Sequence, residues 1–117
     1  MSSLLVITAD GKAKRVRGSR SSIGGRISEL NDYSLTTMRP TGRTMIYLFS
    51  DGYQDQFGGN KGKKYMQNNF RELLIKNSNL ETKSQLAEID KTFYTWKGEE
   101  KQVDDVLVVG LEINIEP

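Results

Sequence analysis

Two strand-forming runs that lie far apart in the chain each meet acidic residues at one end, and this pattern constrains the fold more than any other feature. The first run, Thr44–Ser50, is followed directly by Asp51, and the second, Val106–Ile115, is preceded by Asp104 and Asp105. Apolar and aromatic residues dominate both runs, which is typical of β-strands. If the strands pair antiparallel, the end of the first lies beside the start of the second. We therefore expect Asp51 and Asp104 to meet at one rim of a sheet.

A pair of carboxylates at that rim indicates a cation site. Two carboxylates held close together repel each other unless a cation or a proton lies between them. Clusters made only of oxygen ligands suit Mg²⁺ or Mn²⁺. The chain has no cysteine and no histidine, which excludes disulfides, zinc-finger ligands, cysteine nucleophiles and histidine acid–base chemistry. Any chemistry must therefore use Asp, Glu, Lys, Arg, Tyr, Ser or the backbone.

The composition is that of one globular domain. The chain has 117 residues, of which 36% are hydrophobic and 27% charged, and this length has room for a single domain. No apolar run approaches the roughly 18 residues of a membrane span. The apolar start, Leu4–Ile7, is too short for a signal peptide and lacks a basic beginning. We therefore expect a cytoplasmic protein. The formal net charge of +2 is too small to argue for nucleic-acid binding.

The first half of the chain predicts a meander of antiparallel strands. We expect strands at Leu4–Thr8, Ala13–Val16 and Tyr33–Met38, ahead of Thr44–Ser50. Asp10-Gly11 predicts a two-residue hairpin turn, because both positions of such a turn favour positive φ. A meander of this kind suits a sheet with one buried face.

The stretch from residue 12 to residue 20 is basic. Its charged side chains are Lys12, Lys14, Arg15, Arg17 and Arg20. One interpretation of these charges is a solvent-exposed edge strand, on which they prevent pairing with another chain. The alternative is a patch that attracts a phosphorylated partner. We favour the edge strand. Aromatic residues do not interleave with the basic ones, so nucleic-acid binding ranks last.

The stretch after Asp51-Gly52 is glycine-rich and polar. Residues 53–64 predict a mobile loop beside the acidic residues. Such glycines also serve as plain turn residues, so this loop alone is weak evidence for phosphate binding.

Two helices are predicted between that loop and the last strand. The first covers Tyr65–Asn77 and the second Thr82–Lys97, on the basis of apolar residues at helical spacing. Thr82 and Gln85 fit a capping box, and Gly98 is a plausible stop. The apolar stripe of the second helix consists of Leu86, Ile89, Phe93 and Trp96. We expect Phe93 and Trp96 to pack in the core against the sheet. With roughly six strands and two helices, the fold class is α+β, with helices covering one face of an antiparallel sheet.

An ordered series of motifs resembles a known family. The motifs are Ser50-Asp51-Gly52-Tyr53-Gln54-Asp55-Gln56-Phe57-Gly58-Gly59, Lys63-Lys64, Trp96-Lys97-Gly98, and Gln102-Val103-Asp104-Asp105-Val106-Leu107-Val108-Val109-Gly110. In this order and spacing they resemble the C-terminal half of metal-dependent (PPM), 2C-type protein serine/threonine phosphatases, and the SpoIIE-like branch of bacterial signalling proteins above all. Ser22-Ile23-Gly24-Gly25 resembles the Pro-Ile-Gly loop of that branch, with Ser in place of Pro.

The resemblance implies a fold, a reaction and a set of site residues. The family fold is a β-sandwich of two antiparallel sheets with helices outside each, and its members hydrolyse phosphoserine or phosphothreonine. Asp51 and Asp104 are then catalytic metal ligands in a binuclear Mn²⁺ or Mg²⁺ centre, whose activated water attacks phosphorus directly. Asp55 matches the second acid of the family's Asp-Gly-x-x-Asp element, and binds a further metal or orients water. Asp105 supports a ligand rather than binding metal itself.

The chain also departs from the family pattern. It has no histidine, and no Gly-Asp element precedes Asp51, whereas the first half of family domains supplies further acidic ligands and a Gly-His-Gly loop. We therefore expect residues 1–117 to be the C-terminal portion of one phosphatase domain without its N-terminal half. The expected partners are a phosphoprotein substrate and the missing N-terminal half or an upstream sensor domain. We expect the isolated chain to be inactive, since two carboxylates cannot complete a hexacoordinate site. The alternative is a non-catalytic module that forms a homodimer or binds a partner through a bare sheet face.

Overall fold

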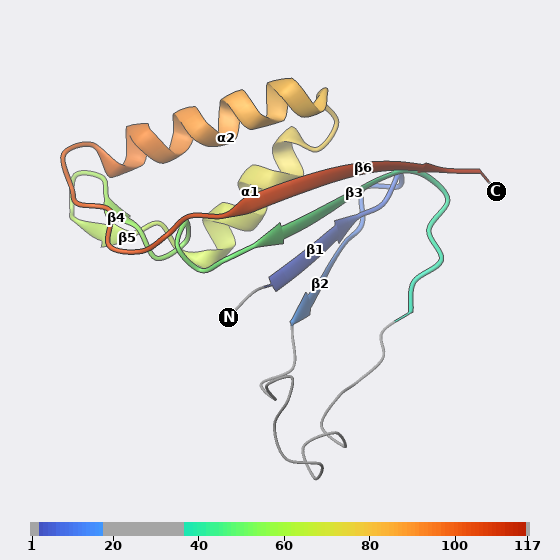
Figure 1. Cartoon of the computed structure of the whole chain (residues 1–117), viewed down its shortest axis with the longest axis horizontal. Helices are drawn as coiled ribbons and strands as arrows, with labels where there is room; N and C mark the ends of the chain where they lie inside the picture. The colour runs from blue at the N-terminus through green and yellow to red at the C-terminus, as the bar shows by residue number, and fades with distance from the viewer. Residues whose placement is uncertain (1–2, 18–36, 117) are drawn as a thin grey trace, which may run out of the picture.

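The computed structural model describes residues 3–17 and 37–116 (Figure 1). Within these residues the elements, in chain order, are β1 (Ser3–Ile7), β2 (Ala13–Arg17), β3 (Gly42–Phe49), β4 (Phe57–Gly58), β5 (Lys63–Lys64), α1 (Gln67–Asn77), α2 (Thr82–Lys97) and β6 (Val108–Ile115). This confirms the predicted α+β class with six strands and two helices. Among the described residues, no helix combines the length and apolar character that a bilayer span requires.

The large sheet is antiparallel throughout. Its strand order is β2-β1-β3-β6, so β2 and β6 form the two edges. β3 and β6 pair along their whole length, from Gly42 opposite Ile115 to Phe49 opposite Val108. The end of β3 therefore lies beside the start of β6, as the two runs predict. The last strand is shorter than predicted, because it begins at Val108 rather than at Val106.

The turn between β1 and β2 is longer than the predicted two-residue turn. Thr8 N donates to Lys12 O at 2.9 Å, and Gly11 N donates to Thr8 O at 2.9 Å, which leaves three residues in the loop. Of the predicted pair, only Gly11 has a positive φ, at 84°. A three-residue hairpin needs a left-handed residue only at its last position, and glycine fits there without strain. β2 then returns along the edge with Lys14 exposed.

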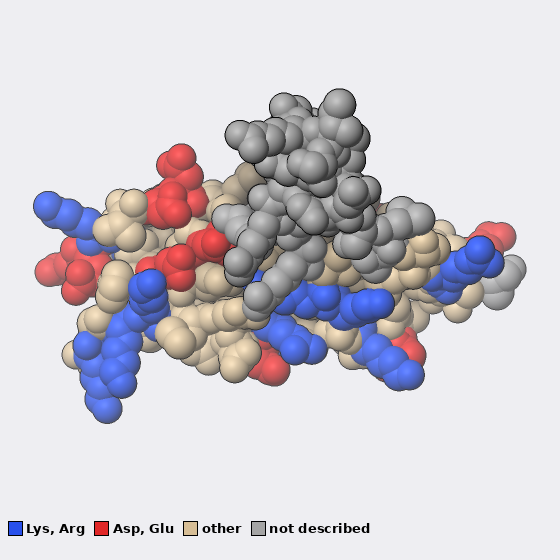
Figure 2. All heavy atoms as spheres, turned by 90° about the horizontal axis from the view of Figure 1, so that it is seen from below, with Lys and Arg blue, Asp and Glu red and all other residues tan. Residues whose placement is uncertain are grey.

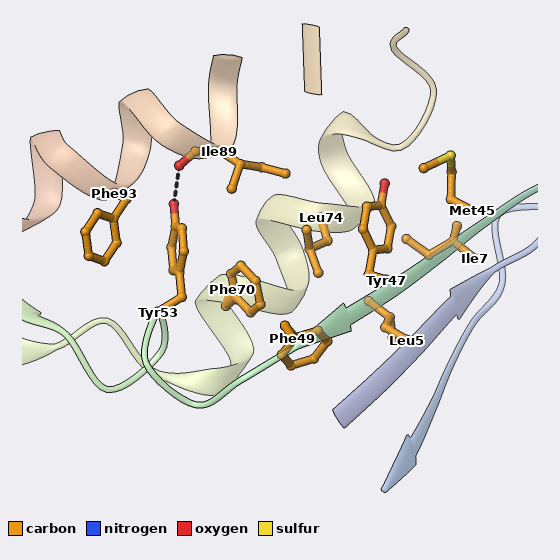
Figure 3. Close-up of a cluster of buried hydrophobic side chains, with 10 residues drawn as sticks. All are labelled: Leu5, Ile7, Met45, Tyr47, Phe49, Tyr53, Phe70, Leu74, Ile89 and Phe93. Atoms are coloured by element: carbon orange, nitrogen blue, oxygen red, sulfur yellow. Dashed lines mark hydrogen bonds between the residues drawn. The ribbon is translucent and has the colours of Figure 1, made fainter. Parts of the chain in front are cut away.

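Both helices cover the same face of the large sheet, and the core lies between them (Figure 3). Side chains of a strand alternate between its two faces, so Met45, Tyr47 and Phe49 of β3 all point toward the helices and are buried. The buried partners are Leu5 and Ile7 from β1, Phe70 and Leu74 from α1, and Ile89 and Phe93 from α2. Burial of each such large side chain contributes about 1.5–3 kcal/mol, which fixes the helices onto the sheet.

The opposite face of the sheet is apolar but open along β3 and β6. Leu48 is 42% exposed, and its neighbours on β6, Val109 and Leu111, are 47% and 53% exposed. The described residues thus form one large sheet with helices on one side, together with the small β4-β5 pair. They correspond to one layer of the predicted sandwich, and the second large sheet is not among them.

Helix α2 does not begin with the predicted capping box. Its N-cap is Glu81, Thr82 is already helical, and no side chain caps the first turn. The amide of Gln85 is instead buried and donates to Leu80 O at 2.9 Å, while its oxygen accepts from the hydroxyl of Tyr47. With its oxygen accepting from Tyr47 and its nitrogen donating to Leu80 O, the Gln85 amide does not bond the N–H of the N-cap residue. At the other end Gly98 ends the helix as predicted, with φ of 53° and its N–H on Tyr94 O at 3.0 Å.

Several further sequence predictions differ from the structure in the bounds of an element or in the burial of a residue. Helix α1 begins at Gln67 rather than at Tyr65, since Met66 before it has a φ of 83°. Leu86 of the apolar stripe is 68% exposed and borders a groove between α2 and β6, so it lies outside the core. The predicted Tyr33–Met38 strand lies largely outside the described residues, and its last two positions, 37 and 38, are not in a strand. Ser22–Gly25 and Arg20 lie outside them altogether.

Candidate metal centre at the acidic rim

The ends of β3 and β6 are joined by Ser50, the residue before Asp51. Ser50 N donates to Leu107 O at 3.0 Å. The hydroxyl of Ser50 donates to Asp105 O at 3.2 Å and accepts from Leu107 N at 3.1 Å. Three hydrogen bonds thus extend the ladder past the last strand pair and hold the two acidic segments side by side. We call Asp51, Asp55, Asp104 and Asp105 the acidic rim.

Gly52 lets the two backbones approach closely. A Cβ atom at this position would overlap the carbonyl oxygen of Asp105 and press on the Cα of Val106. Only glycine therefore fits beside Asp51, which gives the Asp-Gly pair a packing reason that the sequence does not reveal. The contact also fixes the distance between the two acidic segments at the level of their backbones.

Asp51 and Asp55 lie one helical turn apart. Residues 51–55 form a turn in which Asp55 N donates to Asp51 O at 3.0 Å. Asp51 is partly buried, and Asp55 forms an ion pair with Lys64, whose Nζ lies 3.9 Å from Asp55 Oδ1. The structure thus places both predicted acids of this motif on the same short turn.

Asp104 and Asp105 lie on the irregular segment that leads into β6, Asp104 in a bend, and both are exposed. One carboxylate oxygen of Asp104 accepts the backbone N–H of Asp105 at 2.8 Å. Gln102 Nε2 donates to Asp104 O at 3.0 Å. The first bond orients the Asp104 carboxylate, and the second holds its backbone.

The acidic rim offers the type of ligand that Mg²⁺ and Mn²⁺ prefer, but it offers too few of them. Carboxylate oxygens are what these ions prefer. Within residues 3–17 and 37–116, however, no three acidic side chains gather closely enough to hold a metal ion. A hexacoordinate ion needs more protein or water oxygens than this arrangement supplies. The described residues therefore do not form a complete metal site by themselves.

Tyr53 anchors the turn that carries Asp51. It is buried, its ring stacks on Phe70 at 4.5 Å between centroids, and its hydroxyl donates to Ile89 O at 2.6 Å (Figure 3). Burial raises the pKa of Tyr53 far above its usual range, so the phenol stays neutral. Its ring and its hydroxyl hold the turn onto α1 and α2.

Gln56 and Trp96 form a second anchor, which we call the Trp96 lock. Trp96 Nε1 donates to Gln56 O at 2.9 Å, and Gln56 Nε2 donates to Lys101 O at 2.9 Å, just ahead of Asp104. The Trp96 carbonyl lies so close to Gly58 that no Cβ fits there. Trp96 was expected to pack against the sheet, and this is wrong: it packs on the β4-β5 hairpin, because the hairpin glycines leave room for its ring.

Sequence reasoning missed Ser50, Gly52 and Gln56 as residues that build the rim. Ser50 and Gly52 flank the predicted ligand Asp51, which is the only signal that could have pointed to them. Gln56 acts through its buried amide on a segment far along the chain, and no local pattern predicts such a contact.

A solved structure matches this arrangement over nearly the whole chain. The SiaA-PP2C domain of Pseudomonas aeruginosa superimposes on it with a TM-score of 0.77 and 23% sequence identity, over 97% of this chain and 43% of that one. The chain has a PP2C-like fold. The predicted resemblance to 2C-type phosphatases is thus confirmed for the fold. No protein-family model matches the sequence, and no curated protein matches it.

The PP2C-like chain spans less than half the length of the domain that it matches. More than half of that domain has no counterpart here, which agrees with the single sheet layer and with the shortage of acidic ligands at the rim. The similarity therefore shows the fold of the described residues.

Proposed function

We propose that this chain is the C-terminal portion of a metal-dependent phosphoprotein phosphatase domain that acts on phosphoserine or phosphothreonine. One observation supports this above all: two acidic segments from distant parts of the chain meet at the end of the β3-β6 ladder of a PP2C-like sheet. In this proposal Asp51 and Asp104 are metal ligands, Asp55 binds a further ion or orients water, and Asp105 supports Asp104. We place the activity in bacterial cytoplasmic signalling.

The metal that the proposal requires is Mn²⁺ or Mg²⁺, which when bound lowers the pKa of water and neutralises phosphate charge. The residues of this chain have a simpler task, which is to hold ligand oxygens in place. Ser50 and Gly52 fix the spacing of the two segments, and Tyr53 and the Trp96 lock prevent the turn and the β6 lead-in from moving apart. A site held in this way loses little entropy when an ion binds.

The remaining ligands would come from the N-terminal half of the domain. This half would also supply the second sheet, for which the open apolar face of β3 and β6 is suited. The proposal therefore expects little or no turnover by the 117-residue chain alone, and activity from a chain extended to the full domain length.

The test is Mn²⁺-dependent hydrolysis of p-nitrophenyl phosphate by the extended domain. Asp51→Asn and Asp104→Asn should each lower kcat/KM by about 100-fold or more, because each removes a charged metal ligand. Glu72→Gln, on the exposed side of α1, is the matched control and should change nothing. An extended domain that shows no Mn²⁺-dependent activity, or an Asp51→Asn variant that stays fully active, contradicts the proposal.

A second candidate is a non-catalytic module that self-associates. The observation that favours it is the same open face, where Leu48, Val109 and Leu111 are exposed together. Light scattering on the 117-residue chain separates the two: a stable homodimer supports self-association, and a monomer across micromolar concentrations contradicts it.

A further inference from the structure

The β4-β5 hairpin beside the acidic rim carries three exposed lysines. They are Lys61, Lys63 and Lys64, and we call residues 57–64 the lysine hairpin. In Figure 2, basic and acidic side chains gather next to each other at the end of the molecule that holds β4 and β5 (left). The predicted mobile loop is thus an antiparallel pair with Phe57 opposite Lys64 and Gly58 opposite Lys63.

The lysine hairpin is attached to α2 and closed at its base. Gly59 N, at the start of its turn, donates to Trp96 O at 2.9 Å, and Tyr65 N donates to Gln56 O at 2.9 Å next to the last strand pair. The Trp96 ring lies over Gly59, where a Cβ would come within 2.7 Å of it. Because the backbone is fixed in this way, a ligand that binds the lysines has to order only their side chains.

The hairpin is also joined to the acidic rim. Lys64 forms the ion pair with Asp55, one helical turn from Asp51. Gln56 connects the base of the hairpin to Lys101, ahead of Asp104. Among the described residues, Lys61 and Lys63 form no ion pair with an acidic side chain of this chain. Their charges are therefore not neutralised internally, and they lie on the same hairpin as Lys64, whose side chain pairs with Asp55 of the acidic rim.

We propose that the lysine hairpin binds the acidic residues that flank the phosphorylated residue of a protein substrate. This inference rests on the proposed function, since the acidic rim must receive the phosphoryl group. An extended peptide advances about 3.3 Å per residue, so acidic residues a few positions from the phosphorylated one can reach the lysines. Attraction between opposite charges then steers the substrate and sets its direction.

Charge at the rim favours a peptide over a nucleic acid. A nucleic acid carries a phosphate at every nucleotide, and Asp55, Asp104 and Asp105 would repel the phosphates that extend beyond the lysines. An acidic phosphopeptide can place its carboxylates on the hairpin and a single phosphoryl group at the rim. The substrate class is thus a protein segment phosphorylated within an acidic sequence.

Peptide binding by the 117-residue chain tests the inference without requiring activity. Three fluorescent peptides are compared by anisotropy, with and without Mn²⁺: a phosphoserine peptide with acidic flanks, the same peptide with neutral flanks, and the acidic peptide without phosphate. The peptides with acidic flanks should bind better than the peptide with neutral flanks, and their affinity should fall as salt rises. Equal affinity for acidic and neutral flanks, tighter binding of a single-stranded oligonucleotide, or no binding of the acidic phosphopeptide overturns the inference.

Charge reversal assigns the binding to the hairpin. The double variant Lys61→Glu/Lys63→Glu should weaken binding of the acidic phosphopeptide by about tenfold, as expected when two exposed attractive pairs become repulsive. The control, Lys76→Glu/Lys83→Glu, makes the same change of net charge on exposed helix positions and should bind nearly as the unchanged chain does. An equal loss in both variants means that net charge alone acts, which also overturns the inference.

Kinetics of the extended domain separate this inference from the proposed function. The hairpin variant should raise KM for the acidic phosphopeptide about tenfold and leave kcat/KM for p-nitrophenyl phosphate unchanged, because that substrate has no flanking residues. If the extended domain does not hydrolyse p-nitrophenyl phosphate at all, the proposed phosphatase function is contradicted. If the domain is active but the hairpin variant has an unchanged KM for the peptide, only the proposed role of the lysine hairpin is contradicted.

Discussion

Gly52 lies directly against the backbone carbonyl of Asp105, so the residue that follows one predicted metal ligand touches the residue that follows the other. This contact sets how closely the end of β3 and the start of β6 approach. Because it is made by backbone atoms, no side chain can adjust to relieve it. The spacing of Asp51 and Asp104 therefore depends on the absence of a Cβ at one position.

We predict that Gly52→Ala disrupts the rim. The new Cβ would overlap Asp105 O, so one segment has to move, at a cost of about 2–4 kcal/mol in the free energy of unfolding. Urea denaturation measures this cost. Gly11→Ala is the control: Gly11 has a φ of 84° but open space around it, so it should lose only about 1–2 kcal/mol. Equal losses in the two variants would show that the contact with Asp105 is not tight.

We predict that Ser50→Ala loosens the junction without unfolding the protein. The variant loses the bond from the hydroxyl to Asp105 O and the bond from Leu107 N to the hydroxyl. The expected cost is about 1–2 kcal/mol, and the amide of Leu107 should exchange hydrogen faster than in the unchanged chain. Ser84→Ala, on an exposed turn of α2, should alter stability by no more than about 0.5 kcal/mol. Unchanged exchange at Leu107 would contradict the prediction.

The pairing of the acidic segments was predictable because it follows from strand direction alone. Thr44–Ser50 and Val106–Ile115 are strongly strand-forming, and antiparallel pairing then brings Asp51 near Asp104 whatever the rest of the chain does. The structure confirms the pairing of β3 with β6. The roles of the four acids stay predictions, since the ligands that would complete the site are not among the described residues.

The contacts that depend on close tertiary approach were not predictable. Trp96 continues the apolar stripe of α2, and this periodicity predicts that it packs against the sheet. Its ring packs on the hairpin instead, because Gly58 and Gly59 have no side chains in the way. Thr82 has the right neighbour for a capping box, but Gln85 finds buried partners in Tyr47 and Leu80. In both cases a residue distant in sequence offers a better contact than the local pattern does.

We predict that Trp96→Phe releases the lysine hairpin. The variant loses the indole bond to Gln56 O and part of the ring contact with Gly59. We expect a loss of about 1–3 kcal/mol in stability and faster hydrogen exchange at Gly59 and Tyr65, whose amides hold the hairpin. Tyr94→Phe, an exposed aromatic two residues earlier on α2, is the control and should leave both quantities unchanged. If hydrogen exchange becomes faster only in β1 and β2, and not at Gly59 and Tyr65, Trp96 does not hold the lysine hairpin in place.

The last prediction concerns stability at high pH. Burial raises the pKa of Tyr47 from 10.0 to about 12, and its hydroxyl donates to Gln85. The folded state thus favours the neutral phenol, so the contribution to stability is fully present below pH 10 and is lost as pH rises from 10 to about 12. Over that interval each such tyrosine lowers the unfolding free energy by about 1.4 kcal/mol per pH unit.

Tyr47→Phe tests this directly. The variant should be less stable near pH 7, by about 1–2 kcal/mol, because Gln85 loses its partner. It should also lose stability less steeply above pH 10, since one titrating group is gone. Denaturation in urea at a series of pH values gives both quantities, and Tyr94→Phe, whose hydroxyl is exposed, should keep the slope of the unchanged chain. If Tyr47→Phe and the unchanged chain decline with the same slope, the Tyr47 phenol is not held neutral by burial, and its contact with Gln85 is not the buried bond described above.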